Sequence, residues 1–443
     1  MCHSAKKLRK FQEEKLDKVS PSFCLAKWYE GTIWLYQGAT ASCHHNPTTK
    51  IDLDKDDLSS LHNTKVKIED RAMMLNGEQP NGCGYCWNAE KFGQLSDRIY
   101  KSYSYNDNLI ISDIPKKVTP IRLEVAFSRV CNMACAYCGP EFSSAWAKDI
   151  KVHGSYNLIT NSKYNGDIKT KIIDEDDNEY IAAFFEWWPE LSKTLEIMRI
   201  TGGEPLLHNK FWEFIEIIKQ TKNFTGHFIV NTNLILQKGQ VERFIENTKF
   251  LSDNNSVSIM TSCESSLDDA EFTRDGFDKD VWLKNVHLIL NTSKIHMTLS
   301  AAVNNISVWT YKEYLKLVNE LRAEYGSERI TLNANRVYEP KFLQIQIIPE
   351  ELRNEIADEI ETTVSTLEHI RTADLGLSQI NGLTDFLRSA EGSFDGPHDS
   401  ADQKKLIMND LIKFYDSYMQ KRNKSDVYLD SRFKKWIKGL RNG

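Results

Sequence analysis

Residues 121 to 138 read IRLEVAFSRVCNMACAYC, and this stretch decides the fold that we expect. Its first seven residues, Ile121 to Phe127, form an apolar run that predicts a strand. Cys131, Cys135 and Cys138 follow this run, with Tyr137 just before the last cysteine. In α/β barrels the functional side chains gather at the carboxyl ends of the strands. The three cysteines therefore stand where a site is expected.

Short apolar runs continue to alternate with helical patterns as far as residue 348, which predicts repeated βα units around a parallel sheet. The helix expected after the second strand places Phe211, Phe214, Ile215 and Ile218 on one face. We expect an α/β fold with a partial (β/α)6 TIM-type barrel. Its six predicted strands are Ile121 to Phe127, Leu195 to Thr201, His227 to Asn231, Val257 to Thr261, Ile295 to Ala301 and Arg329 to Asn333.

The chain of 443 residues exceeds one average domain, and we expect three segments. Residues 1–115 would form a small cysteine-bearing module, residues 116–349 the partial barrel, and residues 350–443 a helical C-terminal extension. A second helix is expected around Tyr180 to Lys193, between the first two strands.

The composition excludes several classes of protein. With 56 basic and 62 acidic residues the surface has no excess of positive charge, which argues against nucleic acid as a partner. The sequence has no run of 18 or more apolar residues and no secretory signal, so we expect no membrane partner and a cytoplasmic location. In a reducing compartment, clustered cysteines are read first as metal ligands.

The array C-x3-C-x2-C supplies three thiolates, one fewer than a closed site needs. A structural zinc ion or an iron-sulfur cubane takes four protein ligands. Three cysteines leave one metal position open to a ligand that the protein does not supply. The alternative is a zinc site that is completed by a remote fourth residue.

Polar motifs also follow the later strands. The second strand ends in Gly202, Gly203, Glu204 and Pro205. Two glycines let the backbone approach a ligand closely and a carboxylate pairs with an ammonium, although alone the motif reads as a turn before a helix. The other candidates are Asn231 and Asn233 after the third strand, then Ser262, Glu264 and Arg274 after the fourth. Their alternative roles are helix capping and a surface ion pair.

The cysteine array, its aromatic residue and the Gly-Gly-Glu loop together resemble the radical S-adenosylmethionine (SAM) superfamily. The resemblance implies that Cys131, Cys135 and Cys138 hold a 4Fe-4S cluster whose free iron is chelated by SAM. It implies that one electron cleaves SAM and that the resulting 5′-deoxyadenosyl radical abstracts a hydrogen atom from substrate. An electron donor such as flavodoxin or ferredoxin would be a partner. The implied SAM-binding residues are Tyr137, Gly202, Gly203, Glu204, Pro205, Asn231, Asn233, Ser262 and Arg274.

A second set of cysteines precedes the predicted barrel. Cys24 and Cys43 fit C-x13-G-x4-C, with a hairpin expected around Thr32 to Tyr36, and Cys83 and Cys86 form C-x2-C. The spacing suits zinc as well as an iron-sulfur cluster, and His44 or His45 could replace one thiolate. The set resembles SPASM or twitch modules, which implies an auxiliary 4Fe-4S cluster. In the family such modules follow the barrel, so the order here is permuted.

Three functions remain open on the sequence alone. The resemblance to modules of peptide maturases and sulfatase-maturating enzymes implies hydrogen abstraction from a peptide or protein side chain. The alternative is a dehydrogenase or isomerase that acts on a small metabolite such as a sugar, nucleotide or amino-alcohol. The third is a catalytically inactive, metal-stabilised scaffold, which has no use for an open iron site. The sequence selects no substrate and no catalytic residue, and it leaves open whether SAM is consumed or regenerated.

Overall fold

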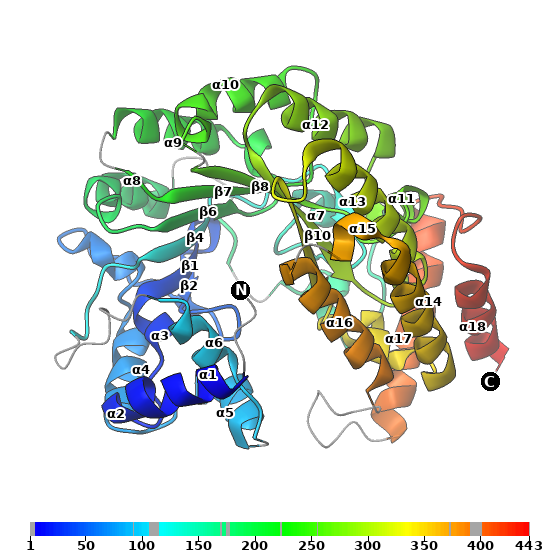
Figure 1. Cartoon of the computed structure of the whole chain (residues 1–443), viewed down its shortest axis with the longest axis horizontal. Coiled ribbons are helices and arrows are strands. Elements are labelled where there is room, and N and C mark those ends of the chain that lie inside the picture. The colour runs from blue at the N-terminus through cyan, green and yellow to red at the C-terminus, as the bar shows by residue number, and fades with distance from the viewer. Residues whose placement is uncertain are drawn as a thin grey trace. The chain divides into compact units, whose positions relative to one another are not determined.

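The computed structural model describes residues 5–91, 93–105, 115–168, 171–173, 178–221, 224–254, 256–371, 374–389 and 401–442. The chain divides into two compact units, each with helices and strands (Figure 1). The first unit contains Met1–Ser128 and Lys171–Val230. The second contains Arg129–Thr170 and Asn231–Gly443.

The first unit is built on six strands. They are β1 (Glu30–Trp34), β2 (Ala39–Ala41), β3 (Thr49–Lys50), β4 (Arg122–Ala126), β6 (Ile197–Thr201) and β7 (His227–Thr232), whose last two residues belong to the second unit. Its described α- and π-helices are α1 (Ala5–Phe11), a π-helix (Gln12–Leu16), α2 (Asp17–Val19), α3 (Leu25–Tyr29), α4 (Lys65–Leu75), α5 (Gly84–Lys91), α6 (Asp97–Tyr103), α8 (Glu179–Leu191) and α9 (Asn209–Gln220).

The strands of the first unit are ordered β7-β6-β4-β1-β2-β3. The pairs β6/β7, β4/β6 and β1/β4 are parallel, with Trp34 opposite Ala126 and Ala126 opposite Thr201. The pairs β1/β2 and β2/β3 are antiparallel. The turn between β1 and β2 includes Gly38 at φ 58°, where a Cβ atom would lie 2.6 Å from the ring of Tyr180. The N-terminal residues therefore extend the same sheet that carries the first predicted strand, and the expected hairpin is confirmed.

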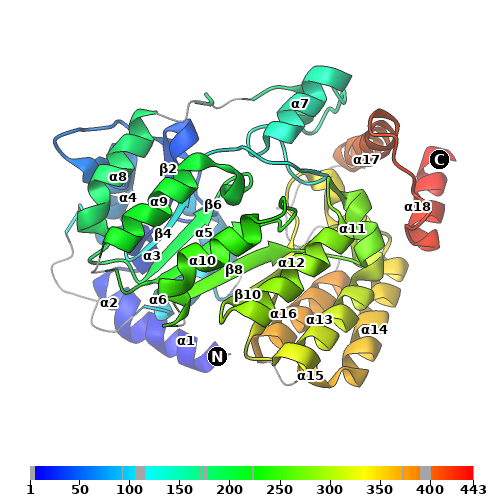
Figure 2. The same cartoon turned by 90° about the horizontal axis from the view of Figure 1, so that it is seen from above.

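Helices α8 and α9 lie side by side in the first unit (Figures 1 and 2). The ring centroids of Trp188 and Phe214 are 4.8 Å apart. Phe211, Phe214, Ile215 and Ile218 are all buried, as the helical period predicts. Burial of such an apolar face is what fixes an amphipathic helix on a sheet.

The second unit has strands β8 (Val257–Ser262), β10 (His296–Val303) and β11 (Ile330–Arg336), which pair in parallel, and a separate antiparallel pair, β5 (Ala134–Cys135) and β9 (Arg274–Asp275). Its described helices are α7 (Ser144–His153), α10 (Gln240–Ser252), α11 (Leu267–Thr273), α12 (Lys279–Thr292), α13 (Tyr311–Tyr325), α14 (Glu350–Thr366), α15 (Glu368–Arg371), α16 (Asp374–Arg388), α17 (Ala401–Lys421) and α18 (Ser431–Asn442). In Figure 2, α17 and α18 lie beside each other at the C-terminal end of the chain.

The predicted α/β class, the mostly parallel strands and all six predicted strand positions are confirmed, with ends that differ by at most three residues. The helix expected around Tyr180 to Lys193 is α8. Closure of the strands into a partial barrel stays a prediction, and so do the three segments at 1–115, 116–349 and 350–443. None of the helices in the described ranges combines the length and the apolar character that crossing a bilayer requires.

Candidate functional site

The first cysteine set lies on one loop of the second unit. Cys135 is buried in β5, and Cys131 and Cys138 on either side of it are half-buried. The amide of Met133 donates to the sulfur of Cys131 at 3.4 Å, and the amide of Cys138 donates to the carbonyl of Cys135 at 2.9 Å. All described cysteines are free thiols, so none of the seven site cysteines is used by a disulfide.

The loop is held by the short strand pair β5/β9, in which Cys135 lies opposite Arg274 and Ala134 opposite Asp275. Gly276 follows β9 at φ 93°, and a Cβ atom there would lie 2.7 Å from the carbonyl oxygen of Asn132. Only glycine allows this close approach without strain. The sequence Arg-Asp-Gly at 274–276 therefore positions the backbone of the cysteine loop, a role that the spacing did not reveal.

Arg274 is also part of a buried charged group. Its guanidinium donates to the hydroxyl of Tyr137 and lies 3.3 Å from a carboxylate oxygen of Glu264. Burial alone would lower the pKa of Arg274, but the neighbouring Cys135, Tyr137 and Glu264 raise it well above its ordinary value, so the arginine stays charged. Burial raises the pKa of Glu264, and Arg274 opposes that shift. Of the SAM-binding candidates, the structure thus brings Tyr137 and Arg274 to the cysteine loop.

Burial also governs the thiols of this loop. It raises the pKa of Cys135, and it raises the pKa of Cys138 to about 12 with a further contribution from Cys135. A thiol in such surroundings is protonated until a metal displaces the proton. The positive charge of Arg274 favours the thiolate of Cys135, because it lowers the pKa of that thiol against the effect of burial.

The C-terminal helix α17 and the residue after it contact the same loop. The hydroxyl of Tyr418 lies 3.3 Å from the carbonyl of Ala134 and 3.4 Å from that of Thr273. Arg422 donates to the same Ala134 carbonyl at 2.8 Å, and the indole of Trp146 donates to the carbonyl of Cys135 at 2.8 Å. The helical period of the last 90 residues gave no sign of these contacts, because their partners lie far away in sequence.

The remaining candidates of the second unit differ in placement. Asn233 donates to the side-chain carbonyl of Asn132, inside the cysteine array, at 2.8 Å. Asn231 lies in β7 and Ser262 is the last residue of β8, opposite Ser300 of β10. Asn233 is therefore tied to the cysteine loop, and the roles of Asn231 and Ser262 toward SAM stay predictions.

The Gly-Gly-Glu loop belongs to the first unit, after β6. Gly202 has φ 127°, and a Cβ atom there would lie 2.5 Å from the carbonyl oxygen of Ser128. The amide of Gly203 donates to that oxygen at 3.1 Å. Glu204 is buried and accepts from the amide of Leu206 at 3.2 Å, and Pro205 begins a short 3-10 helix. The structure thus shows the turn and capping role of this motif, and its role toward SAM stays a prediction.

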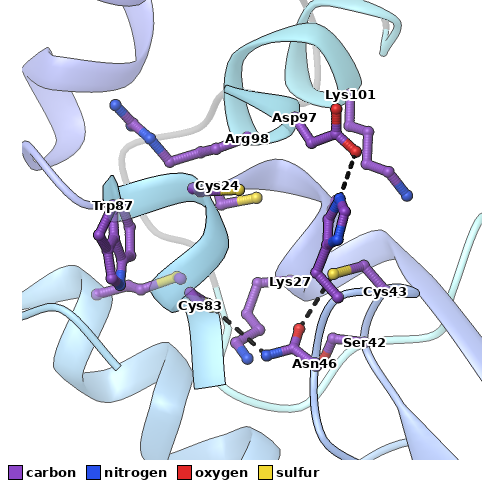
Figure 3. Close-up of a pocket in the computed structure, with 14 residues that line it drawn as sticks. Cys24, Lys27, Ser42, Cys43, Asn46, Cys83, Trp87, Asp97, Arg98 and Lys101 are labelled. Atoms are coloured by element: carbon purple, nitrogen blue, oxygen red, sulfur yellow. Dashed lines mark hydrogen bonds and ion pairs between the residues drawn. The ribbon is translucent and has the colours of Figure 1, made fainter. Parts of the chain in front are cut away.

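The second cysteine set meets at one cavity of the first unit. Cys24 precedes α3, Cys43 follows β2, Cys83 ends the 3-10 helix before α5, and Cys86 lies in the first turn of α5, yet all four line a cavity of about 30 Å³. Figure 3 shows Cys24, Cys43 and Cys83 around this space. Burial, with a smaller contribution from neighbouring cysteines, raises the pKa of Cys24 to about 11 and that of Cys86 to about 12.

Two histidines and a carboxylate stand beside this cavity. One oxygen of Asp97 lies 2.7 Å from Nε2 of His45 and 3.3 Å from Nε2 of His44, and His45 stacks on Tyr85. Within the described ranges, this is the one set of at least three histidine, cysteine or acidic side chains whose ligand atoms all lie within 4.8 Å of one another. No three sulfurs of either cysteine set therefore lie within 4.8 Å of one another among the described residues.

Both cysteine sets fit an iron-sulfur cluster by the chemistry of their donors. Each offers thiols that are free, gathered and at least half-buried, with an amide N–H aimed at one sulfur. At the second set that donor is Asn46, whose amide nitrogen lies 3.5 Å from the sulfur of Cys83. Such hydrogen bonds tune metal-bound thiolates.

No protein-family model matches the sequence. No curated protein matches it either. Among solved structures, the chain is similar to polyhistidine-tagged anSMEcpe with bound AdoMet, with 15% identity and a TM-score of 0.35 over 54% of this chain and 57% of that one.

The chain is also similar to SuiB from Streptococcus suis. For SuiB bound to S-adenosylmethionine the identity is 12% and the TM-score 0.38, over 76% of this chain and 69% of that one. For a second SuiB structure the TM-score is 0.35, again at 12% identity, over 76% of this chain and 68% of that one. The chain thus spans little more than half of the anSMEcpe chain, and likenesses of this size do not establish a family.

Proposed function

We propose that this protein is a radical SAM enzyme, with a 4Fe-4S cluster on Cys131, Cys135 and Cys138. The observation that carries the proposal is a loop with three gathered free thiols that is backbone-paired to a buried arginine. When bound, the reduced cluster supplies one electron that breaks a C–S bond of SAM, which yields methionine and a 5′-deoxyadenosyl radical that takes a hydrogen atom from substrate.

The residues around the loop support this chemistry by position and charge. Arg274 is fixed by Tyr137 and Glu264 and keeps a positive charge beside Cys135, which suits an anionic cluster and the carboxylate of SAM. Asn233 orders Asn132 within the array. We assign the Gly202 to Pro205 turn, Asn231 and Ser262 to SAM binding on the motif alone.

The second set, Cys24, Cys43, Cys83 and Cys86, is proposed to hold an auxiliary 4Fe-4S cluster, as in a twitch-like module. A tetrahedral zinc ion with Zn–S bonds of about 2.3 Å requires sulfurs about 4 Å apart. No three of these sulfurs lie within 4.8 Å of one another among the described residues, so they are not arranged for a tetrahedral zinc ion. Zinc remains the alternative that metal analysis tests directly.

We propose a peptide or protein side chain as the substrate, with a small metabolite as the alternative, and a flavodoxin or ferredoxin as the electron donor in the cytoplasm. A catalytically inactive scaffold is the competing function. The three cysteines of the loop, together with Gly202, Gly203 and Glu204, argue against it, because an inactive scaffold has no use for an open iron site.

The test is the formation of 5′-deoxyadenosine by protein reconstituted without oxygen, with dithionite and SAM. We expect product from the wild type and none from Cys135→Ala. Cys263→Ala is the matched control, because Cys263 is also a buried free thiol but lies outside both sets, and it should retain product formation. Intact clusters with no 5′-deoxyadenosine in the wild type would support the inactive scaffold instead.

A further inference from the structure

A second cavity of the first unit adjoins the one lined by the four cysteines. It measures about 270 Å³ and lies between α4, β2, β3 and the residues before α5. Lys27, Ser42 and Asn46 line both cavities and so form a shared wall. A ligand in the larger cavity would therefore lie next to the auxiliary cysteine site, where a substrate or an effector would be expected to bind.

Lys67 is the decisive residue of the larger cavity. It is 2% exposed, and its ammonium donates to the hydroxyl of Thr40 at 2.8 Å. The charged groups that act on it are Arg71, Lys27 and Cys43, and burial together with the two cations lowers the pKa of Lys67 well below its ordinary value. A buried ammonium without an anion is costly, and a ligand that supplies the missing charge would raise that pKa again.

The neighbouring cations do not relieve this imbalance. Asp70 also lines this cavity, but it pairs with Lys27 at 2.6 Å, so that carboxylate is used. Arg71 is fully buried and its hydrogen bonds go to neutral groups, the carbonyls of Lys27 and Lys116, the side chain of Asn63 and Nε2 of His62. Among the described residues, three buried cations thus share one carboxylate in this part of the fold.

A polar group without a partner completes the site. The hydroxyl of Ser42 is buried and has no hydrogen-bond partner among the described residues. Ser42 lies on the shared wall, and Figure 3 shows it beside Asn46 and near Lys27. A hydroxyl donor and an ammonium donor at one cavity are the groups that bind an oxyanion.

We propose that the cavity lined by Lys67, Ser42 and Lys27 binds a carboxylate or phosphate group of an anionic ligand beside the auxiliary cysteine site. The inference rests on the proposed function only in taking the neighbouring cysteines as the site of an auxiliary cluster. The oxyanion accepts from Lys67 and Ser42, and its charge stabilises the protonated form of Lys67, which burial, Arg71 and Lys27 disfavour. A neutral ligand would not stabilise that form.

The test is calorimetric titration of the reconstituted full chain with inorganic phosphate and, separately, with acetate, at constant ionic strength and without oxygen. We expect saturable binding of one or both probes, and the comparison of the two distinguishes a phosphate site from a carboxylate site. Lys67→Met should weaken binding by about 10-fold or more. Lys65→Met changes an exposed lysine of the same helix and should leave binding unchanged.

Unfolding measurements provide a second test if a variant folds poorly. Methionine matches the length of lysine and removes the buried charge, so Lys67→Met should fold at least as stably as the wild type. Phosphate or acetate should raise the melting temperature of the wild type and not that of Lys67→Met. Absence of saturable binding of both probes, or equal binding by Lys67→Met, would overturn the proposal.

One further result would assign a different role to Lys67. If Lys67→Met alters the iron content or the reduction potential of the auxiliary cluster while probe binding stays intact, the lysine serves the cluster and not a ligand. Neither result depends on 5′-deoxyadenosine formation, so failure of this inference and failure of the proposed function are distinguishable.

Discussion

Arg274 and Glu264 show how a single buried pair supports the cysteine loop. Both side chains are almost completely buried, and their charges face each other and Tyr137. One oxygen of Glu264 has no hydrogen-bond partner among the described residues, so the pair is not saturated by the protein itself. The residue that pairs with Cys135 across β5/β9 is therefore also the residue that carries the positive charge.

Asp269 is a second buried carboxylate, on α11. One of its oxygens accepts from the hydroxyl of Thr310 at 2.6 Å, and the other has no partner among the described residues. Burial raises the pKa of Asp269 to about 6, with Thr310 opposing the shift. Since the folded state then binds this proton more tightly than the unfolded state, the contribution of Asp269 to the free energy of unfolding falls as pH rises from about 4 to about 6.

We predict that Asp269→Asn removes this pH dependence. The amide keeps an acceptor for Thr310 and cannot ionise, so above pH 6 the variant should be more stable than the wild type, by about 3 kcal/mol at most. Urea unfolding at several pH values measures this difference. Asp280→Asn, at an exposed carboxylate of α12, is the control and should leave the pH slope as it is. A pH slope in Asp269→Asn equal to that of the wild type would refute the assignment.

At the scale of elements, α17 connects the C-terminal segment to the cysteine loop. Phe414 and Tyr418 of this helix belong to an aromatic cluster with Trp146, and Arg422 lies 4.2 Å over the ring of Trp146. Asp410 of the same helix accepts from the amides of Ile159 and Thr160. The helix thus orders the polar segment that follows the cysteines as well as the loop itself.

We predict that Arg422→Met makes the cluster on this loop more labile. The carbonyl of Ala134 loses its charged donor, at a cost of about 2–3 kcal/mol, so the loop opens more often. The rate at which a chelator removes iron from reconstituted protein should rise about tenfold or more. Lys413→Met, at an exposed position of α17, is the matched control. An unchanged rate of iron loss would show that the helix does not protect the loop.

At the scale of the whole molecule, the two cysteine sets belong to different units. The set at Cys131, Cys135 and Cys138 is held by Trp146, Arg274 and Arg422 of its own unit. The second set is held by α3, α5 and the turn after β2, which belong to the first unit. Changes at sites that share no partner have additive effects. The two sets should therefore load independently.

We predict that alanine at Cys131, Cys135 and Cys138 together leaves the auxiliary cluster in place, and that alanine at Cys83 and Cys86 leaves the SAM-binding cluster in place. The losses of iron and of acid-labile sulfide in the two variants should add up to the wild-type content. Elemental analysis together with electron paramagnetic resonance measures each cluster. Loss of both clusters from either variant would show that the sets depend on each other, and zinc without sulfide would support the alternative metal.

The sequence alone determined the parallel strands, the helix face around Phe214 and the two groups of cysteines. Strands and amphipathic helices follow from local periodicity, and cysteine spacing follows from the chemistry of a short loop. Only the tertiary structure decided that Arg274 lies opposite Cys135, that Arg422 contacts Ala134 and that Lys67 lies buried against the hydroxyl of Thr40. Some of these contacts join residues that are far apart in the chain, and others depend on how much water reaches a side chain. Neither property can be deduced from the local sequence.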